Sequence, residues 1–215
     1  MRLYIRSDQC LHIKDKMKHI KLFEQFISEA VEISNPIDGK EVVIMPGRFQ
    51  PFHKGHLAAL ENASKQFGKP VIPIQVISKK DTSPFPENLL QKIGDDVAKN
   101  ESYIEKFFIY PRGYGLTVIP WFVRFLRDNG YETVGVAAGS DREKAYAGQM
   151  KYITSNKTDT VVSSDFEMKI VDQRVEGGPS GTKVREALAA DDQETFNELV
   201  PTYLHKYYKE LKKYI

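Results

Sequence analysis

Two histidines three residues apart, His53 and His56, are the residues of this sequence best suited to do chemistry. Apolar residues before them predict a short buried strand over 42–45, and apolar residues at helical spacing follow, so both histidines are expected on one face of a first helical turn. There, imidazole N–H groups can donate hydrogen bonds to a phosphoryl group as negative charge accumulates on it. The alternatives are a structural pair or two ligands of a metal site, which would lack its third ligand and the glutamate of an HExxH motif.

The loop between that strand and that helix is suited to close contact with a ligand. Pro46 and Pro51 restrict its backbone, whereas Gly47 and Gly55 leave no Cβ in the way. In an open α/β sheet, the carboxyl end of a strand faces the positive amino end of the next helix. We therefore expect an anionic ligand at this loop.

A second candidate site lies near the C-terminus, in the run from Glu176 to Arg185. Its glycines permit a tight loop, and Ser180 or Thr182 can cap the helix that begins there. Backbone N–H groups at that helix end form an anion site, to which Thr182 adds a hydroxyl donor. Arg185, one turn on, adds a forked cation. This run is expected to hold phosphate groups.

The elements that must position these residues alternate between strands and helices. Pro73 lies in the second predicted strand and favours an edge or a bulged position for it. Strands are predicted over 42–45, 71–77, 106–110, 133–138, 161–163 and 166–171, and helices after residue 56, over 87–99, from 118 to 126, after 142 and in the tail from 186. This order predicts a doubly wound α/β fold with a parallel sheet over residues 41–215 and C-terminal helices.

The two motifs resemble those of the HxGH nucleotidyltransferase superfamily, whose members are cytidylyltransferase-like. The fuller form Gly-Arg-Phe-Gln-Pro-Phe-His-Lys-Gly-His, over 47–56, is similar to the archaeal-type nicotinamide mononucleotide adenylyltransferases, as is the Ser-Gly-Thr-x-Val-Arg form over 180–185. The resemblance implies a Rossmann-like fold and the transfer of a nucleotidyl group from a nucleoside triphosphate with release of pyrophosphate. ATP and nicotinamide mononucleotide, giving NAD, are the leading substrates.

The resemblance also assigns roles to individual residues. His53, His56 and Arg185 are expected to be catalytic. The residues expected to bind the nucleotide are Gly47, Arg48, Phe49, Gln50, Lys54, Gly55, Gly139, Asp141, Ser180, Gly181 and Thr182. Asp141 lies in a Gly-Ser-Asp-Arg segment that follows a predicted strand, where a simple helix cap is the alternative. Mg²⁺ should accompany the triphosphate, held mainly by phosphate and water, with no metal cage made by the protein.

The acceptor site is expected to use Trp121, Lys79, Arg112 and Arg142. Trp121, the only tryptophan, corresponds to one that stacks on the nicotinamide ring in the archaeal-type enzymes, although its spacing fits a core residue equally well. The chain departs from the family at the segment that follows the second predicted strand. The usual arginine is absent there, with Asn88 or Leu89 near its place, and Lys79 or Lys80 is expected to supply the missing charge.

Composition narrows the class of protein. The 215 residues, 41% of them hydrophobic, are enough for one α/β domain. The net charge of +2 is spread along the chain, which argues against nucleic acid as the partner. The lysines among the aromatic residues of the tail are interpreted as the solvent-exposed face of a helix that covers the core. A single cysteine precludes an internal disulfide, and no apolar run approaches a membrane span. A cytoplasmic protein is expected.

Residues 1–40 are interpreted as an N-terminal extension, with an amphipathic helix from Met17 to Ile33. This helix could pack on the domain or on a second copy of the chain, in a homo-oligomer. Residues 17–29 also resemble the capsid-targeting segments of internal head proteins of large bacteriophages, which are cut after a glutamate, here Glu29. That interpretation implies contact with a capsid scaffold, packaging in the virion, action in the host cytoplasm and a true start at Met17.

The two motifs and the predicted fold also fit functions other than NAD synthesis. A CTP-dependent cytidylyltransferase, or a transferase with another phosphorylated acceptor, would use the same two motifs. A protein of a different class, which binds nucleotides or serves as a virion-internal component without turnover, would use the fold alone. Both motifs keep their polar residues, which favours the enzyme.

Overall fold

The computed structural model describes residues 40–77, 84–110, 118–154, 166–171 and 178–215. The chain divides into two compact units, residues 1–37 and 38–215, and every described element belongs to the second. The predicted extension, the capsid-targeting segment over 17–29, the short segment over 161–163, Lys79 and Arg112 lie outside the described residues.

Five parallel strands form the sheet, in the order β3-β2-β1-β4-β5. The strands are β1 (Lys40–Gly47), β2 (Val71–Val76), β3 (Phe108–Tyr110), β4 (Tyr131–Ala138) and β5 (Glu167–Ile170). The helices between them are α2 (Lys54–Phe67), α3 (Glu87–Asn100), α4 (Val118–Asp128) and α5 (Glu143–Thr154). The chain starts at the centre of the sheet, builds outward to β3 and then returns to the other side of β1. This confirms the doubly wound α/β fold and puts the switch point between β1 and β4.

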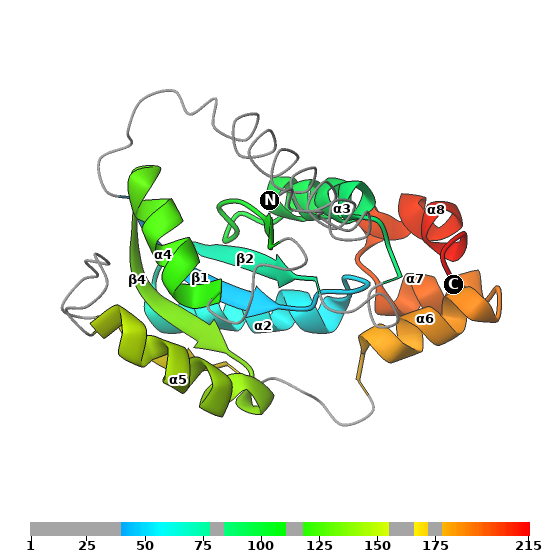
Figure 1. Ribbon diagram of the computed structural model, residues 1–215. Coiled ribbons are helices and arrows are strands. Elements are labelled where there is room, and N and C mark those ends of the chain that lie inside the picture. Colours follow the sequence, from blue (N-terminus) through cyan, green and yellow to red (C-terminus); the bar gives the residue numbers. More distant parts are fainter. Residues whose placement is uncertain (1–39, 78–83, 111–117, 155–165, 172–177) are drawn as a thin grey trace, which may run out of the picture. The chain divides into compact units, whose positions relative to one another are not determined.

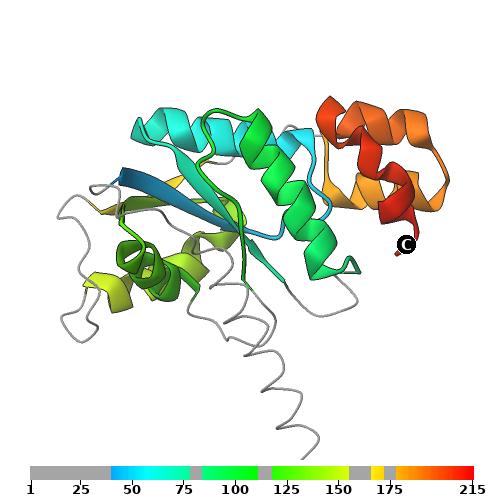
Figure 2. The same cartoon turned by 90° about the horizontal axis from the view of Figure 1, so that it is seen from above.

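Alternate residues of β1 face two separate cores. Val43 and Met45 pack in a cluster with residues of α2 and α3, while Val42 and Ile44 pack in a cluster with residues of α4 and α5. Figure 1 shows the elements, and Figure 2 shows α2 and α3 on one side of the sheet and α4 and α5 on the other. Because β1 is buried on both faces, its sequence is a continuous apolar run.

The second strand is an interior strand, so of the two positions predicted for it, an edge and a bulge, the edge is wrong. β2 pairs with β1 on one side and with β3 on the other. Pro73 falls between two stretches of pairing on the β3 side, the bridge of Val71 with Ile104 and the ladder that starts at Ile74. The proline, which lacks an N–H group, therefore lies where the ladder is interrupted.

The C-terminal tail folds into short helices that join the α2 and α3 side of the sheet. They are α6 (Gly181–Ala189), α7 (Gln193–Leu199), the 3₁₀ helix η3 (Thr202–Tyr207) and α8 (Tyr208–Lys212). Val184, Leu188 and Phe196 are fully buried in the same cluster as Val43 and Met45. The phenols of Tyr203 and Tyr207 donate hydrogen bonds to carboxylates of Glu101 and Asp96 near the end of α3, at 2.8 and 2.7 Å. Each of the described helices is too short or too polar to be a membrane span.

Candidate active site

The loop after β1 has a strained backbone at Phe49. Its φ of 37° lies in the left-handed region, which an aromatic residue seldom adopts. The ring is 2% exposed and packs edge-on against Phe107 and His56, with centroids 5.9 and 5.0 Å apart. A Cβ at Gly47 would lie 2.8 Å from the Phe49 ring, so glycine is required there. The Phe49 ring, for which nucleotide binding is predicted, thus lies in the core and packs against His56.

His53 and His56 meet at the start of α2. His53 is the N-cap residue, and its backbone N–H donates to Nδ1 of His56 at 3.3 Å. The two rings stack, with centroids 3.6 Å apart and planes inclined by 25°. Because Nδ1 of His56 accepts this bond, the neutral His56 ring carries its proton on Nε2. The pair therefore offers a donor at the positive end of a helix that has no acidic residue in its first turn.

Burial keeps His53 neutral. The side chain is 6% exposed, and desolvation lowers its pKa from 6.5 to about 4. Its Nδ1 atom is buried and has no hydrogen-bond partner among the described residues. An uncharged imidazole at pH 7 can donate a hydrogen bond to a phosphoryl oxygen without adding a formal charge.

The lowered pKa of His53 predicts acid-sensitive stability. The unfolded chain binds a proton at His53 below about pH 6.5, whereas the folded protein does so only near pH 4, so the free energy of unfolding should fall as the pH decreases between these values. Over this whole pH range, the free energy of unfolding should fall by about 3 kcal/mol. Urea unfolding of wild type and His53→Asn at pH 7 and pH 5 measures it. The substitution should reduce the pH dependence, and an unchanged dependence would contradict burial as the cause.

The second motif forms the amino end of α6. Ser180 is the N-cap residue, and its hydroxyl accepts a hydrogen bond from the backbone N–H of Lys183 at 3.2 Å. One turn on, Arg185 Nη2 donates to Thr182 Oγ1 at 3.2 Å. This helix, too, has no acidic residue in its first turn. Its positive end is therefore available to an anion.

The two motifs are in direct contact. Arg185 Nη1 donates to the backbone oxygen of Gln50 at 2.8 Å, across 135 residues of sequence. A Cβ at Gly181 would lie 2.7 Å from that same oxygen, and a Cβ at Gly55 would lie 3.1 Å from the backbone oxygen of Pro179. The amino ends of α2 and α6 therefore converge, and glycine at both positions allows the approach.

Gly181→Ala should separate the two loops. The added methyl group would meet a backbone oxygen rather than a flexible side chain, so we expect the free energy of unfolding to fall by about 1–3 kcal/mol. Gly148→Ala is the matched control, because this glycine lies in α5 with no atom within 4 Å of the new Cβ. That change should stabilise the protein by about 0.5–1 kcal/mol. Equal stability of the two variants in urea would contradict the close contact.

Three other residues of the first motif range from a buried glutamine to an exposed arginine. Gln50 is 5% exposed, and neither atom of its side-chain amide has a hydrogen-bond partner among the described residues. Such an orphaned amide fits a polar ligand. Lys54 Nζ donates to the backbone oxygen of Glu198 at 2.6 Å, at the carboxyl end of α7. Arg48 is exposed.

A third loop, after β4, lies at the same end of the parallel strands as the first motif. Ser140–Arg142 form a 3₁₀ turn, η2, that leads into α5. Arg142 Nε lies 3.5 Å from Asp141 Oδ2, and a Cβ at Gly139 would lie 3.0 Å from Asp141 Oδ1. Because β4 is the neighbour of β1 beyond the switch point, this loop and the first motif follow adjacent strands at the same end of the sheet, and we expect a ligand crevice between them.

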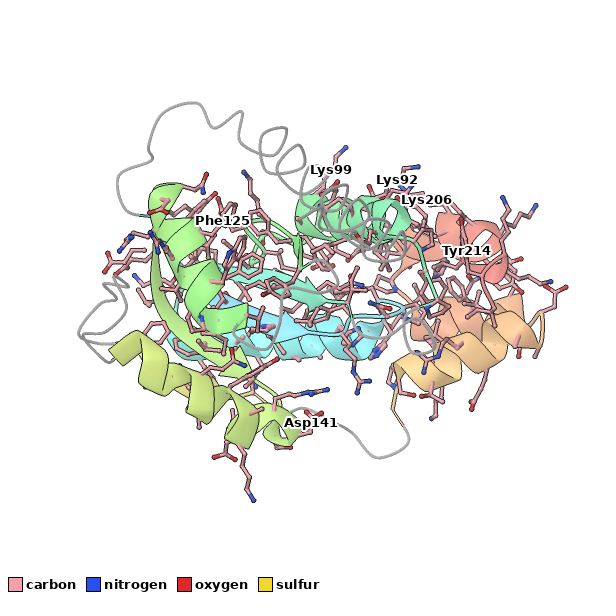
Figure 3. The ribbon with its side chains drawn as sticks, in the orientation of Figure 1. Lys92, Lys99, Phe125, Asp141, Lys206 and Tyr214 are labelled. Carbon is pink, nitrogen blue, oxygen red and sulfur yellow. The ribbon has the colours of Figure 1, made fainter. Side chains whose placement is uncertain are left out.

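Trp121 lies in an aromatic cluster on α4. Its ring stacks on Phe125, with centroids 5.3 Å apart and planes inclined by 8°, and meets Tyr110 and Phe122 edge-on. Phe125 is marked on α4 in Figure 3. One face of the tryptophan is thus covered by Phe125. A ligand ring could stack only on the other face.

The polar groups of the converging loops suit phosphate better than a metal ion. His53, His56 and Arg185 are neutral or cationic donors, which match phosphate oxygens. In the described parts of the chain, no three His, Cys, Asp or Glu side chains come together as metal ligands. Magnesium prefers oxygen ligands, which the phosphates of a bound nucleotide and water can supply.

Part of the chain matches the model of a known protein family. The model of the cytidylyltransferase-like family matches residues 44–98, which run from β1 into α3 and include both histidines. This part of the chain is similar to that family. No curated protein matches the chain in sequence.

Solved structures of mononucleotide adenylyltransferases share the fold. Two structures of nicotinic acid mononucleotide adenylyltransferase from Plasmodium falciparum, complexed with APC and with NaAD, are 13% and 16% identical to the chain, with TM-scores of 0.54 and 0.52. Each comparison covers 82% of this chain and 98% of that chain. A Vibrio parahaemolyticus structure, provisionally named a nicotinate-nucleotide adenylyltransferase, is 15% identical, with a TM-score of 0.51 and coverage of 80% and 98%. At these identities, the likeness is one of fold.

Two residues near the site carry no local signal in the sequence. Phe107 precedes β3, and its ring packs against Phe49 and Phe52 with centroids 5.9 and 6.2 Å apart. Tyr146, on α5, donates a hydrogen bond to the backbone oxygen of Pro46, just before the first motif. Both contacts join segments far apart in the sequence, so periodicity and spacing could not predict them.

Proposed function

We propose that this protein transfers a nucleotidyl group from a nucleoside triphosphate to a phosphorylated acceptor and releases pyrophosphate. The observation that carries the proposal is the convergence of two helix ends, the one with His53 and His56 and the one with Ser180 and Arg185. A triphosphate lying across both would have its α-phosphate at the histidines and its β- and γ-phosphates at α6. Donors placed in this way stabilise charge on the reacting phosphate and on the leaving group.

ATP and nicotinamide mononucleotide, giving NAD, are the proposed substrates. Support comes from the forms of both motifs and from the names of the proteins that share the fold, which act on a pyridine mononucleotide. The proposed acceptor site uses Trp121 and Arg142, together with Lys79 and Arg112, which lie outside the described residues. Mg²⁺ would reach the site with the triphosphate and neutralise part of its charge.

Pyrophosphate release tests the proposal. Purified protein is incubated with Mg²⁺, one of ATP, CTP, GTP or UTP, and one of a panel of acceptors that includes nicotinamide mononucleotide, nicotinic acid mononucleotide and phosphorylated alcohols. Pyrophosphate should form with ATP and a pyridine mononucleotide. Release with CTP and a phosphorylated alcohol would instead identify a cytidylyltransferase. No release with any pair, together with measurable nucleotide binding, would indicate a binding protein.

Trp121 should report on the acceptor. If the pyridinium ring stacks on the tryptophan face opposite Phe125, titration with nicotinamide mononucleotide should quench the protein's only tryptophan. Trp121→Phe should raise the KM of the acceptor by about two- to tenfold and leave that of ATP unchanged, since a cation–π contact contributes about 0.5–1 kcal/mol or more. A tryptophan signal indifferent to the acceptor would remove Trp121 from the site.

A further inference from the structure

Tyr146 makes a buried hydrogen bond at the switch point of the sheet. It lies on α5, is 7% exposed and packs in the cluster that includes Ile44 and Val136. Its phenol donates to the backbone oxygen of Pro46 at 3.1 Å, between residues 100 apart in sequence. A hydroxyl group in an otherwise apolar cluster is unfavourable without a partner, so the position of the ring depends on this bond.

The backbone explains why the Pro46 oxygen needs a partner. The N–H of Val43 donates to the backbone oxygen of Pro70, on the β2 side. Backbone groups of successive residues in a strand point in opposite directions, so those of Pro46, three residues on, point toward β4. The pairing of β1 with β4 ends at Ile44 and Val136. Beyond that point β4 pairs with β5 alone, through Ala138. The phenol of Tyr146 thus takes the place of β4 where the two strands separate.

The same side chain is close to the loop after β4. Arg142 precedes Tyr146 by four residues, and Asp141, which is labelled in Figure 3 and lies in η2 just before α5, is next to Arg142. Burial raises the pKa of the Tyr146 phenol, Arg142 opposes the rise and Asp141 adds to it. The phenol therefore stays protonated in any ordinary assay, and the bond to Pro46 persists.

We propose that Tyr146 is a positioning residue that holds the Gly139–Arg142 loop at a fixed place relative to the Gly47–His56 loop across the crevice. This inference rests on the proposed function. The hydrogen bond joins the carboxyl end of β1, where the first motif begins, to the helix that follows Arg142. Without the bond, Gly139, Asp141 and Arg142 would no longer be held at a fixed distance from the histidines, while the phosphate site on α6 would not change.

Tyr146→Phe tests this role because it removes one oxygen atom and keeps the ring. The matched control is Tyr131→Phe, since Tyr131 is 6% exposed, lies at the opposite end of β4 and bonds Glu105 at 3.4 Å. We expect Tyr146→Phe to raise the KM of the acceptor by about two- to tenfold, as for the loss of one neutral hydrogen bond. The affinity for the triphosphate should fall by no more than this factor, because Gly139 and Asp141 of the same loop are expected to bind the nucleotide, and Tyr131→Phe should leave both constants at wild-type values.

Amide hydrogen exchange provides a second measurement that needs no turnover. Exchange at residues 139–142 should be faster in Tyr146→Phe than in wild type, and unchanged in Tyr131→Phe. Faster exchange in a protein without transferase activity would support the positioning role while the proposed function failed. Wild-type exchange at residues 139–142 would overturn the positioning role, and so would equal kinetic effects of the two variants.

Discussion

His56→Ala should lower kcat by about a hundredfold to a thousandfold. The loss of one preorganised donor to developing charge costs about 2.7–4 kcal/mol of transition-state stabilisation. The affinity for the triphosphate should change much less, because that charge appears only as the reaction proceeds. Steady-state kinetics of pyrophosphate release, together with nucleotide binding by calorimetry, separates the two effects.

Two control variants distinguish catalysis from folding. His56→Ala also removes the acceptor of the His53 N–H bond, a capping interaction worth about 1 kcal/mol, so some loss of stability is expected. His205→Ala removes a histidine whose Nε2 lies 3.0 Å from the Asn197 oxygen, in the C-terminal helices. That variant should lose stability but keep wild-type kcat. His56→Asn, which retains a donor, should fall between. An active His56→Ala protein would exclude this histidine from catalysis.

The sequence predicted those elements whose signal is local. The apolar run of β1 and the helical spacing after His56 depend on residues a few positions apart, and the predicted helix over 87–99 is α3, at Glu87–Asn100. The parallel direction of the strands also followed from the alternation of strands and helices, since parallel strands need crossover connections. The position of β2 in the sheet did not, because whether Pro73 faces an interrupted ladder depends on its neighbours and not on its own strand.

The candidate site was predictable as a set of residue types but not as a geometry. Helix caps and glycine loops are local features, so Ser180 and Gly55 could be recognised in the sequence. The contact of Arg185 with the Gln50 oxygen and that of Tyr146 with Pro46 span more than 90 residues. The same holds for Phe49, whose left-handed backbone persists because distant Phe107 helps to bury its ring.

Arg185→Ala should weaken binding of the triphosphate by about ten- to a hundredfold. Its guanidinium already donates to Gln50 and Thr182, so its orientation is fixed before a ligand arrives, and charge-assisted hydrogen bonds contribute about 1.5–3 kcal/mol each. Unlike His56, it should act on the ground state, because the β- and γ-phosphates carry their charge throughout. Calorimetry with ATP in the presence of Mg²⁺ measures the affinity directly.

A variant of the same helix tells a specific contact from general electrostatics. Lys183→Ala removes an equal charge two residues away, but the Lys183 side chain is exposed and screened, so the affinity should fall by less than about threefold. Arg185→Lys keeps the positive charge but loses the planar guanidinium group that can form two parallel hydrogen bonds, so it should retain only part of the affinity. If Arg185→Ala and Lys183→Ala weakened binding equally, Arg185 would contribute only to the local potential. Since Arg185 also bonds the first motif, its loss should lower kcat as well, which Lys183→Ala should not do.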